Sequence, residues 1–324
     1  MKVFVAGATG AVGRRLVPLL VRHGHEVTGM TRSSSKAEQL RALGAEPVVA
    51  DGLDQAAVRG AVEKTEPEIV IHQMTAGARS FRRFDREFAL TNRLRTEGTD
   101  HLLAASRGVG VRRFIAQSYG NWNYERVGAE PKSEDDPLDR TRRRTSAARS
   151  PRFAIWRTPC SPPRAWRRSR CATGTSTGPV PASPPTAISP SSSAGADCRS
   201  SATAPACGHS FTSPMWLRPP WPRPSVGEGG VYNVVDDEPA SVSVWLPEYA
   251  RALGAKPPRR VPAWIGRIAA GEVGISMMTR IRGASNEKAK RERGWEPRYR
   301  SWREGFRSGL DGPSPPRLRH RSPP

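Results

Sequence analysis

The chain has 324 residues, 36% of them hydrophobic, and a formal net charge of +22 at pH 7. This length suits one large α/β domain, or a nucleotide-binding domain with a smaller second lobe. The sequence contains no apolar run of 18 residues and no signal-peptide pattern, so it predicts a cytoplasmic protein with no membrane partner.

The positive charge is concentrated in one stretch of the chain. Residues 141–225 contain thirteen Arg, no Lys and one acid, so they carry a formal +12, whereas the other 239 residues carry +10. All four Cys and fifteen of the 31 Pro lie there too. A high net charge by itself favours nucleic-acid binding. Because aromatic residues are not interleaved with the basic ones and the charge comes largely from one unusual window, we expect no nucleic-acid partner.

The chain begins with a predicted strand, a glycine-rich turn and a helix. Residues 2–6 are apolar and partly β-branched, and residues 12–20 have apolar positions at helical spacing. Between strand and helix the sequence reads Gly7-Ala8-Thr9-Gly10-Ala11-Val12-Gly13. In this context the motif predicts a site for a dinucleotide pyrophosphate. Gly7 allows the tight turn, Gly10 allows close approach of the phosphates, and Gly13 allows the helix to pack on the strand.

Strands and helices then alternate. The sequence predicts strands at residues 26–30, 47–50, 68–72 and 113–117, and helices at residues 37–43, 55–63 and 84–106. This alternation predicts an α/β fold, a Rossmann-type doubly wound parallel sheet, with its ligand crevice at the carboxyl ends of the strands.

The end of the second predicted strand bears on the choice of dinucleotide. NAD-binding domains place an acid there for the adenosine ribose, but residues 27–37 contain none. Arg32, with Ser33 and Lys36 beside it, could instead pair with a 2′-phosphate. A solvated surface Arg is the other interpretation. We therefore predict NADP as the cofactor, with NAD as the alternative.

Several short motifs in residues 1–139 match those of one known family. They are Gly7 to Gly13, Val49-Ala-Asp51, Val70-Ile-His72-Gln73, Asn92, Gly98-Thr99, Leu102-Leu103 and Arg113 to Ser118. By these residues the chain resembles the extended and atypical short-chain dehydrogenase/reductase family, in its NAD(P)-dependent epimerase/dehydratase group. The resemblance implies that Asp51 contacts the adenine and that Gln73 and Met74 lie along the cofactor. Without it, Asp51 would be interpreted as a helix cap, and His72 as a satisfied core residue more often than as a base.

From about residue 226 the sequence again has the amino-acid composition of a folded domain. The sequence predicts a strand at residues 231–235, a turn at 236–239 and a helix at 241–253. Together with the closing segments, which also resemble the family, these elements predict a small substrate lobe. Trp295 and Trp302 are predicted core residues. A basic cluster is predicted to be a solvated helix face, with a phosphate site as the alternative: Arg280, Arg282, Lys288, Lys290 and Arg291.

The window between these parts lacks both helix and strand periodicity, although the resemblance implies a catalytic helix and a sixth strand there. One interpretation is a disordered Pro/Ser/Arg-rich insert. The other is a reading frame displaced by one base, because GC-rich DNA read out of frame yields Arg, Pro, Ser, Ala, Thr, Cys and Trp. Two compensating frameshifts, near Asp139 and near Ser225, would preserve the length.

The displaced frame can be tested against the family. Shifted back by one base, residues 171–183 permit Leu-Arg-Tyr-Gly-Asn-Phe-Tyr-Gly-Pro-Gly-Thr-Gly-Leu, the strand and loop that the resemblance implies. Residues 207–217 permit Val-Trp-Ser-Phe-Ile-His-Val-x-Asp-Val-Ala, and residues 150–160 permit a helix. We therefore favour the frameshift.

These patterns divide the chain into four parts. Residues 1–139 are predicted to be the NAD(P)-binding domain, 140–225 an irregular window without a sixth strand, 226–310 the substrate lobe, and 311–324 a disordered basic tail. Cys160, Cys171, Cys198 and Cys207 lack the C-x-x-C spacing of common zinc sites, so we predict no metal.

Catalysis in the family uses a Tyr with a Lys four residues later, whose charge lowers the pKa of the Tyr hydroxyl. None of the five Tyr is followed by such a Lys, and the restored frame offers none. Ser118, Tyr119 and Tyr124 are weak catalytic candidates. The predicted function is that of an epimerase, dehydratase or reductase acting on a sugar nucleotide or similar small molecule, impaired in this chain. A non-catalytic NADP-binding regulator is the alternative, and a homodimer is expected.

Overall fold

A computed structural model describes residues 1–76, 84–118, 124–128, 131–138, 229–259 and 261–308, and the backbone of residues 170–176 and 207–208. The predicted tail, residues 311–324, and most of the window lie outside the described residues.

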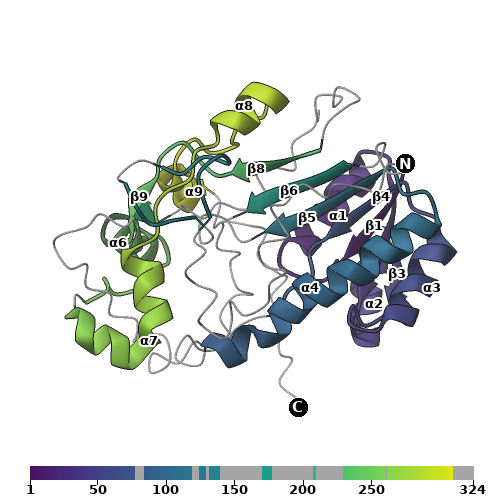
Figure 1. Ribbon diagram of the computed structural model, residues 1–324, viewed down its shortest axis with the longest axis horizontal. Helices are drawn as coiled ribbons and strands as arrows, with labels where there is room; N and C mark the ends of the chain where they lie inside the picture. The colour runs from purple at the N-terminus through teal and green to yellow at the C-terminus, as the bar shows by residue number, and fades with distance from the viewer. Residues whose placement is uncertain are drawn as a thin grey trace, which may run out of the picture.

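A seven-stranded parallel sheet forms the centre of the molecule (Figure 1). Its strands, in spatial order, are β3 (Glu46–Val49), β2 (Glu26–Thr31), β1 (Lys2–Ala6), β4 (Ile69–His72), β5 (Arg113–Ser118), β6 (Arg170–Ser176) and β8 (Gly230–Val234). The order reverses between β1 and β4, which is the point at which such sheets bind nucleotides. The α/β Rossmann-type fold predicted from the sequence is confirmed.

Helices cover both faces of the sheet because side chains alternate along each strand. Val3 and Val5 pack on one face against α1 (Gly13–Arg22) and α2 (Ala37–Ala42), which follows the short 3₁₀ helix η1 (Ser34–Lys36). Phe4 packs on the other face against α3 (Gln55–Thr65) and α4 (Phe84–Gly108). Both layers bring the amino end of a helix to the carboxyl edge of the sheet, where a ligand can reach it.

The prediction that the window supplies no sixth strand is wrong. β6 pairs in parallel with β5 from Arg113↔Arg170 to Ser118↔Thr175, and with β8 from Ala172↔Gly230 to Ser176↔Val234. The prediction relied on prolines removing ladder donors, but residues 164–178 contain no Pro. Strand pairing uses backbone groups, so β5 and β8 can pair with β6 although most of its side chains are small or polar.

The carboxyl-terminal lobe packs around aromatic residues. It contains β9 (Ala240–Ser241), which pairs antiparallel with β7 (Cys207–Gly208), and helices α6 (Val242–Ala252), α7 (Ala263–Thr279), α8 (Glu287–Arg293) and α9 (Trp302–Ser308). Trp302 is fully buried against Trp245 and Phe306, as predicted, whereas Trp295 is half-buried.

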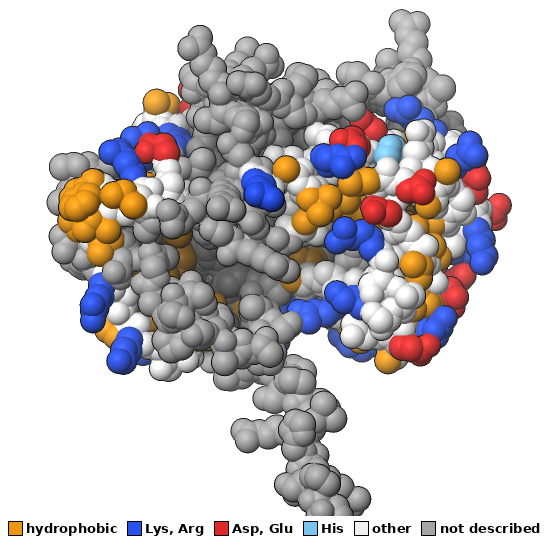
Figure 2. All heavy atoms as spheres, turned by 90° about the horizontal axis from the view of Figure 1, so that it is seen from below, with side chains coloured by type: hydrophobic (Ala, Val, Ile, Leu, Met, Phe, Trp, Pro, Cys, Tyr) orange, Lys and Arg blue, Asp and Glu red, His pale blue; other side chains and the backbone are white. Residues whose placement is uncertain are grey.

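At the α7 end of the molecule hydrophobic side chains gather at the surface, while acidic and basic side chains are interspersed over the sheet half (Figure 2).

Residues 124–138 contact β8 and the segment before α8 in the carboxyl-terminal lobe. The buried Tyr124 hydroxyl donates to Asn233 Oδ1 at 3.2 Å, and Asn233 Nδ2 donates to the Lys132 carbonyl oxygen at 3.4 Å. Lys132 also bridges to Ala284, and its ammonium pairs with Asp136 at 3.1 Å. The lobe therefore depends on contacts between segments that are distant in the sequence.

Candidate cofactor site

The glycine turn after β1 is held against the end of β2. The amides of Gly7 and Ala8 donate to the Met30 carbonyl oxygen at 3.2 and 3.1 Å. The Gly10 amide donates to the Gly7 carbonyl oxygen at 3.0 Å. Gly7 has a φ of +87°, and a Cβ there would lie 2.7 Å from the Gln73 carbonyl oxygen. Only glycine fits this position.

Gly13 brings α1 close to the same turn. A Cβ on Gly13 would overlap the Ala8 carbonyl oxygen, so the helix starts as near the turn as the backbone allows. The amides of Ala11, Val12 and Gly13 donate to no backbone acceptor within the part of the chain that the structure describes. Free amides at a helix start, beside a turn that excludes side chains, make a cradle for a pyrophosphate.

Gln73 borders the cradle from the end of β4. Its amide donates to the Ala6 carbonyl oxygen at 2.8 Å, which fixes the backbone. Its side chain is 8% exposed, and the buried Oε1 has no hydrogen-bond partner among the described residues. Leaving such an acceptor unpaired costs roughly 1–3 kcal/mol, so a donor from a ligand would be stabilising. The hydroxyl and amide groups of a dinucleotide are donors of this kind, and the residues present fit that cofactor.

The end of β2 lies next to the turn and is followed by the positive charge of Arg32. Thr31 is 4% exposed, and its hydroxyl lies 3.2 Å from that of Thr9 and accepts from the Ser33 amide at 3.3 Å. Arg32, the next residue, is exposed and has no hydrogen bond or ion pair within the described residues. Lys36, at the end of η1, is exposed as well.

Sequence reasoning missed two further cations in the first turn of α1, Arg14 and Arg15. Burial, and then the charge of Arg14, lower the pKa of Arg15. The first turn contains no acid, and cations at a helix N-terminus are unfavourable unless an anion is bound there. The signal was available in the sequence as two consecutive Arg after the third glycine.

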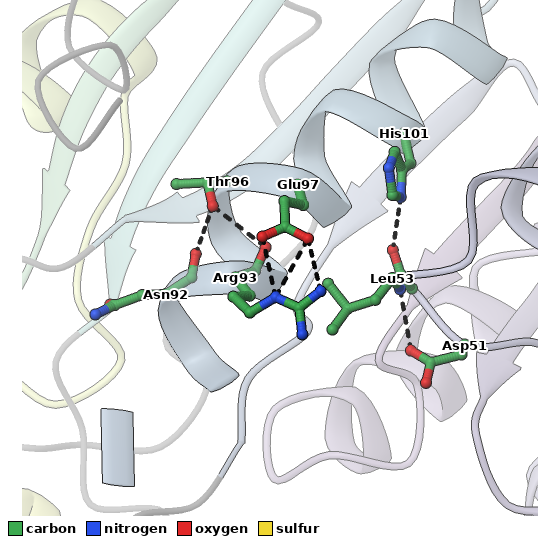
Figure 3. Close-up of polar contacts among 8 residues, drawn as sticks. Asp51, Leu53, Asn92, Arg93, Thr96, Glu97 and His101 are labelled. Carbon is green, nitrogen blue, oxygen red and sulfur yellow. Dashed lines mark hydrogen bonds and ion pairs between the residues drawn. The ribbon is translucent and has the colours of Figure 1, made fainter. Parts of the chain in front are cut away.

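Asp51 shapes the loop between β3 and α3 (Figure 3). Its Oδ1 accepts from the Leu53 amide at 3.0 Å, whereas the N-cap of α3 is Asp54, which accepts from two amides at 3.0 Å. The alternative interpretation of Asp51 as the helix cap is therefore wrong by three residues. His101 of α4 holds the loop from above, with Nδ1 3.2 Å from the Gly52 carbonyl oxygen.

An ion pair on α4 lies on the same side. Arg93 donates three hydrogen bonds to Glu97, from Nε to Oε1 at 3.0 Å, from Nε to Oε2 at 3.2 Å and from Nη2 to Oε2 at 2.8 Å (Figure 3). This pairing, with a smaller contribution from the Asp51 charge, raises the pKa of Arg93. The loop that contains Asp51 therefore lies near a charged guanidinium.

His72 is a satisfied core residue. Its Nε2 lies 3.2 Å from the Leu94 carbonyl oxygen, and its Nδ1 accepts from the Met74 amide at 3.1 Å. Burial lowers the pKa of His72 to about 4. With both ring nitrogens engaged and the ring neutral, His72 is unsuited to act as a base.

The catalytic candidates do not converge on a described site. Tyr124 is 1% exposed, and its hydroxyl is hydrogen-bonded to Asn233. Ser118 ends β5, but its side chain, like all of Tyr119, lies outside the described residues. The basic cluster is dispersed, because Lys290 pairs with Asp237 at 2.7 Å while Arg282 donates to the Gly128 carbonyl oxygen at 2.6 Å.

The described residues contain neither a metal-binding cluster nor a membrane-spanning helix. Among them no group of three or more His, Cys, Asp or Glu could hold a metal ion. No helix in the described ranges is both long and apolar enough to cross a membrane.

Comparison with known sequences relates the chain to NAD(P)-dependent enzymes. A family model described as NAD(P)H-binding matches residues 7–149. A 3-diazoavenalumate denitrifying reductase from a Streptomyces species is 34% identical over 334 aligned positions, which cover 94% of this chain and 99% of that protein. A UDP-glucose 4-epimerase from Mycolicibacterium smegmatis is 33% identical over 144 positions, 43% of this chain and 45% of that protein.

Comparison with solved structures shows the same fold. A UDP-glucose 4-epimerase from Thermotoga maritima with UDP-glucose aligns with a TM-score of 0.68 and 18% identity, covering 95% of this chain and 96% of that one. The Thermus thermophilus UDP-glucose 4-epimerase complex with NAD aligns with a TM-score of 0.65 and 19% identity, covering 95% and 97%.

Proposed function

The chain belongs to the extended short-chain dehydrogenase/reductase family, and from that premise we propose that it is an NADP(H)-dependent reductase of a small molecule. The observation that carries the proposal is the pairing of a dinucleotide cradle with Arg32, unpaired within the described residues, where NAD-binding domains place an acid. When bound, the reduced nicotinamide supplies a hydride.

Three features support NADP over NAD. Arg32 has no partner of its own within the described residues, so its guanidinium is available to a 2′-phosphate, which it can bind with charge-assisted hydrogen bonds. Ser33 and Lys36 flank it. Arg14 and Arg15 add positive charge at the neighbouring helix start.

Replacing Arg32→Ala is expected to weaken NADPH binding by about 10- to 100-fold, the value of a hydrogen bond to a charged group. NADH binding should stay within a factor of two or so, because it has no 2′-phosphate for the guanidinium to bind. Fluorescence titration of both nucleotides measures this. Arg22→Ala is the matched control, because it removes the same charge from the far end of α1. An equal loss for both nucleotides would contradict the assignment.

We propose a diazonium compound as the substrate class. The relative that matches nearly the whole chain is named for a diazo compound and the removal of its nitrogen. The step balances without a proton: the C–N bond breaks, N₂ leaves with its bonding electrons, a hydride from NADPH takes the vacated carbon, and NADP⁺ remains. A chain without the Tyr and Lys pair can support this step, because the step requires no acid or base.

A sugar nucleotide is the second candidate. Structures of the same fold hold UDP-glucose or NAD, and the sequence itself suggested this class. Epimerisation at a hydroxyl carbon requires a group that removes the hydroxyl proton. Neither Tyr124 nor His72 provides one, since Tyr124 is buried and burial lowers the pKa of His72, whose two ring nitrogens both have partners. This ranks the sugar nucleotide below the diazonium compound.

The experiment is a turnover assay with NADPH and 4-carboxybenzenediazonium, following NADPH absorbance and N₂ release. We expect protein-dependent formation of benzoate above a blank without protein, which corrects for direct reaction of the two reagents. UDP-glucose is assayed in parallel. Conversion of UDP-glucose alone would favour the epimerase, and NADPH binding without turnover of either compound would favour the non-catalytic regulator.

The window of residues 140–225 is proposed to be out of frame and to impair the enzyme. The family model match ends at residue 149, shortly after the window begins. Strand β6 has the sequence Arg-Cys-Ala-Thr-Gly-Thr-Ser, whereas strands inside parallel sheets are normally continuous runs of Val, Ile and Leu. The restored sequence for residues 171–177 would place Leu, Tyr and Phe there. These observations support two compensating frameshifts that leave the strand in position but change its side chains.

A further inference from the structure

The buried hydroxyl of Thr31 lies where the glycine turn, the end of β2 and the turn carrying Arg32 meet. We propose that Thr31 is a positioning residue that sets the preference for NADPH over NADH. The inference rests on the proposed NADP-dependent function and adds a residue that does not itself reach the cofactor.

The contacts of Thr31 join two parts of the site. Its hydroxyl lies 3.2 Å from the Thr9 hydroxyl, in the middle of the turn that cradles the pyrophosphate. The same oxygen accepts from the Ser33 amide at 3.3 Å, which anchors the residue after Arg32. The backbone of Thr31 is fixed as well, because its carbonyl oxygen accepts from the Ala50 amide at 2.9 Å.

Arg32 therefore lies between Thr31 and Ser33, whose positions are both fixed by hydrogen bonds. The strand ends at Thr31, and η1 begins at Ser34 after the extended residue Ser33, which has φ −112° and ψ 118°. The Lys36 amide donates to the Ser33 carbonyl oxygen at 3.1 Å, so the position of Ser33 also determines where η1 starts. A single hydroxyl at Thr31 thus fixes the span from the pyrophosphate cradle to the groups proposed for the 2′-phosphate.

This geometry affects the two cofactors differently. The pyrophosphate and the adenosine are common to both and contact the cradle itself. Only NADPH bridges from the cradle to Arg32 through its 2′-phosphate, so only NADPH benefits when the distance between them is fixed in advance. Loosening the connection should reduce the preference without removing dinucleotide binding.

The test compares Thr31→Val with Thr31→Ser in the full-length chain. Valine keeps the shape and β-branching of a buried strand residue but removes the hydroxyl, whereas serine keeps the hydroxyl. Dissociation constants for NADPH and NADH are measured by fluorescence titration, and the melting temperature is measured without ligand.

For Thr31→Val we expect NADPH binding to weaken about fivefold, the value of one lost hydrogen bond, with NADH unchanged. Thr31→Ser should restore the wild-type ratio of the two constants. Equal weakening for both nucleotides, an unchanged ratio, or a Ser variant that behaves like the Val variant would each overturn the role of Thr31. If the wild-type chain itself shows no preference for NADPH, the proposed cofactor fails together with this inference.

Discussion

Restoring the reading frame between Asp139 and Ser225 is expected to convert a chain that binds NADPH with little turnover into a stable and active reductase. The cradle proposed to bind the cofactor is formed by residues outside the window, so we expect binding to survive in the written chain. Hydride transfer also needs a pocket wall that positions the substrate and excludes water. The family resemblance implies that this wall comes from the window and its junction with the substrate lobe.

The expected change is large in both measurements. Misplacing a substrate by about 1 Å can cost 100-fold in rate, so turnover should rise by at least that factor. Each large apolar side chain returned to the sheet contributes about 1.5–3 kcal/mol, so the melting temperature should rise by roughly 10 °C or more.

The comparison uses three genes. One encodes the chain as written, one encodes the restored frame, and a third encodes the written chain with synonymous codons, which controls for changes in expression. Solubility, melting temperature and NADPH-linked turnover are measured for each product. Matching values for the written and restored chains would mean that the window is a functional part of the protein.

Replacing Asp236→Asn is expected to stabilise the protein at neutral and alkaline pH. Asp236 follows β8, is 3% exposed, and has one carboxyl oxygen, Oδ2, that is buried with no hydrogen-bond partner in the part of the chain that the structure describes. Burial, with a smaller contribution from the Asp237 charge, raises the pKa of Asp236 to about 8. Asparagine resembles the protonated carboxyl and keeps the oxygen that accepts from the Glu238 amide at 3.3 Å.

The sign follows from proton linkage. With a pKa of about 8 the native carboxyl keeps its proton up to about pH 8, while the unfolded one loses it near its ordinary pKa of 3.8, so unfolding releases a proton between these values. The free energy of unfolding therefore falls by about 1.4 kcal/mol for each pH unit as the pH rises from 3.8 to 8. The variant should match wild type near pH 4 and exceed it by on the order of 4 kcal/mol at pH 7.

Urea unfolding of both proteins at several pH values measures the difference. Asp237→Asn is the matched control, since that carboxylate pairs with Lys290 at 2.7 Å and accepts from Asn286 at 2.7 Å, contacts that lower its pKa. Its removal should destabilise the protein at neutral pH. A stability difference for Asp236→Asn that does not grow with pH would contradict the buried protonated carboxyl.

The sequence predicted the dinucleotide half closely because its signals are local. The apolar run at residues 2–6, the glycine spacing and the strands up to residue 117 each depend on neighbouring residues, and β1 to β5 follow them. The helix predicted at 241–253 also agrees with α6, which spans Val242–Ala252.

The sequence failed to predict features that depend on contacts between residues far apart in the chain. Strand β6 forms because β5 and β8 offer backbone partners on both sides, which no local pattern records. Tyr124 was a catalytic candidate because it follows β5, yet its partner Asn233 lies 109 residues away. The buried proton of Asp236 depends on packing that the turn sequence Asp-Asp-Glu-Pro does not reveal.

The contacts between distant segments of the carboxyl-terminal lobe also set an order of folding during synthesis. Residues 1–118 contain β1 to β5 and all four helices that flank them, so this half can form as soon as it leaves the ribosome. Residues 124–138 must wait for Asn233 and for the bridge from Lys132 to Ala284. Until residues 283–285 are made, the nascent chain carries a dinucleotide-binding half and a segment whose partners have not yet been synthesised. Chaperone demand and proteolysis should therefore concentrate on that segment.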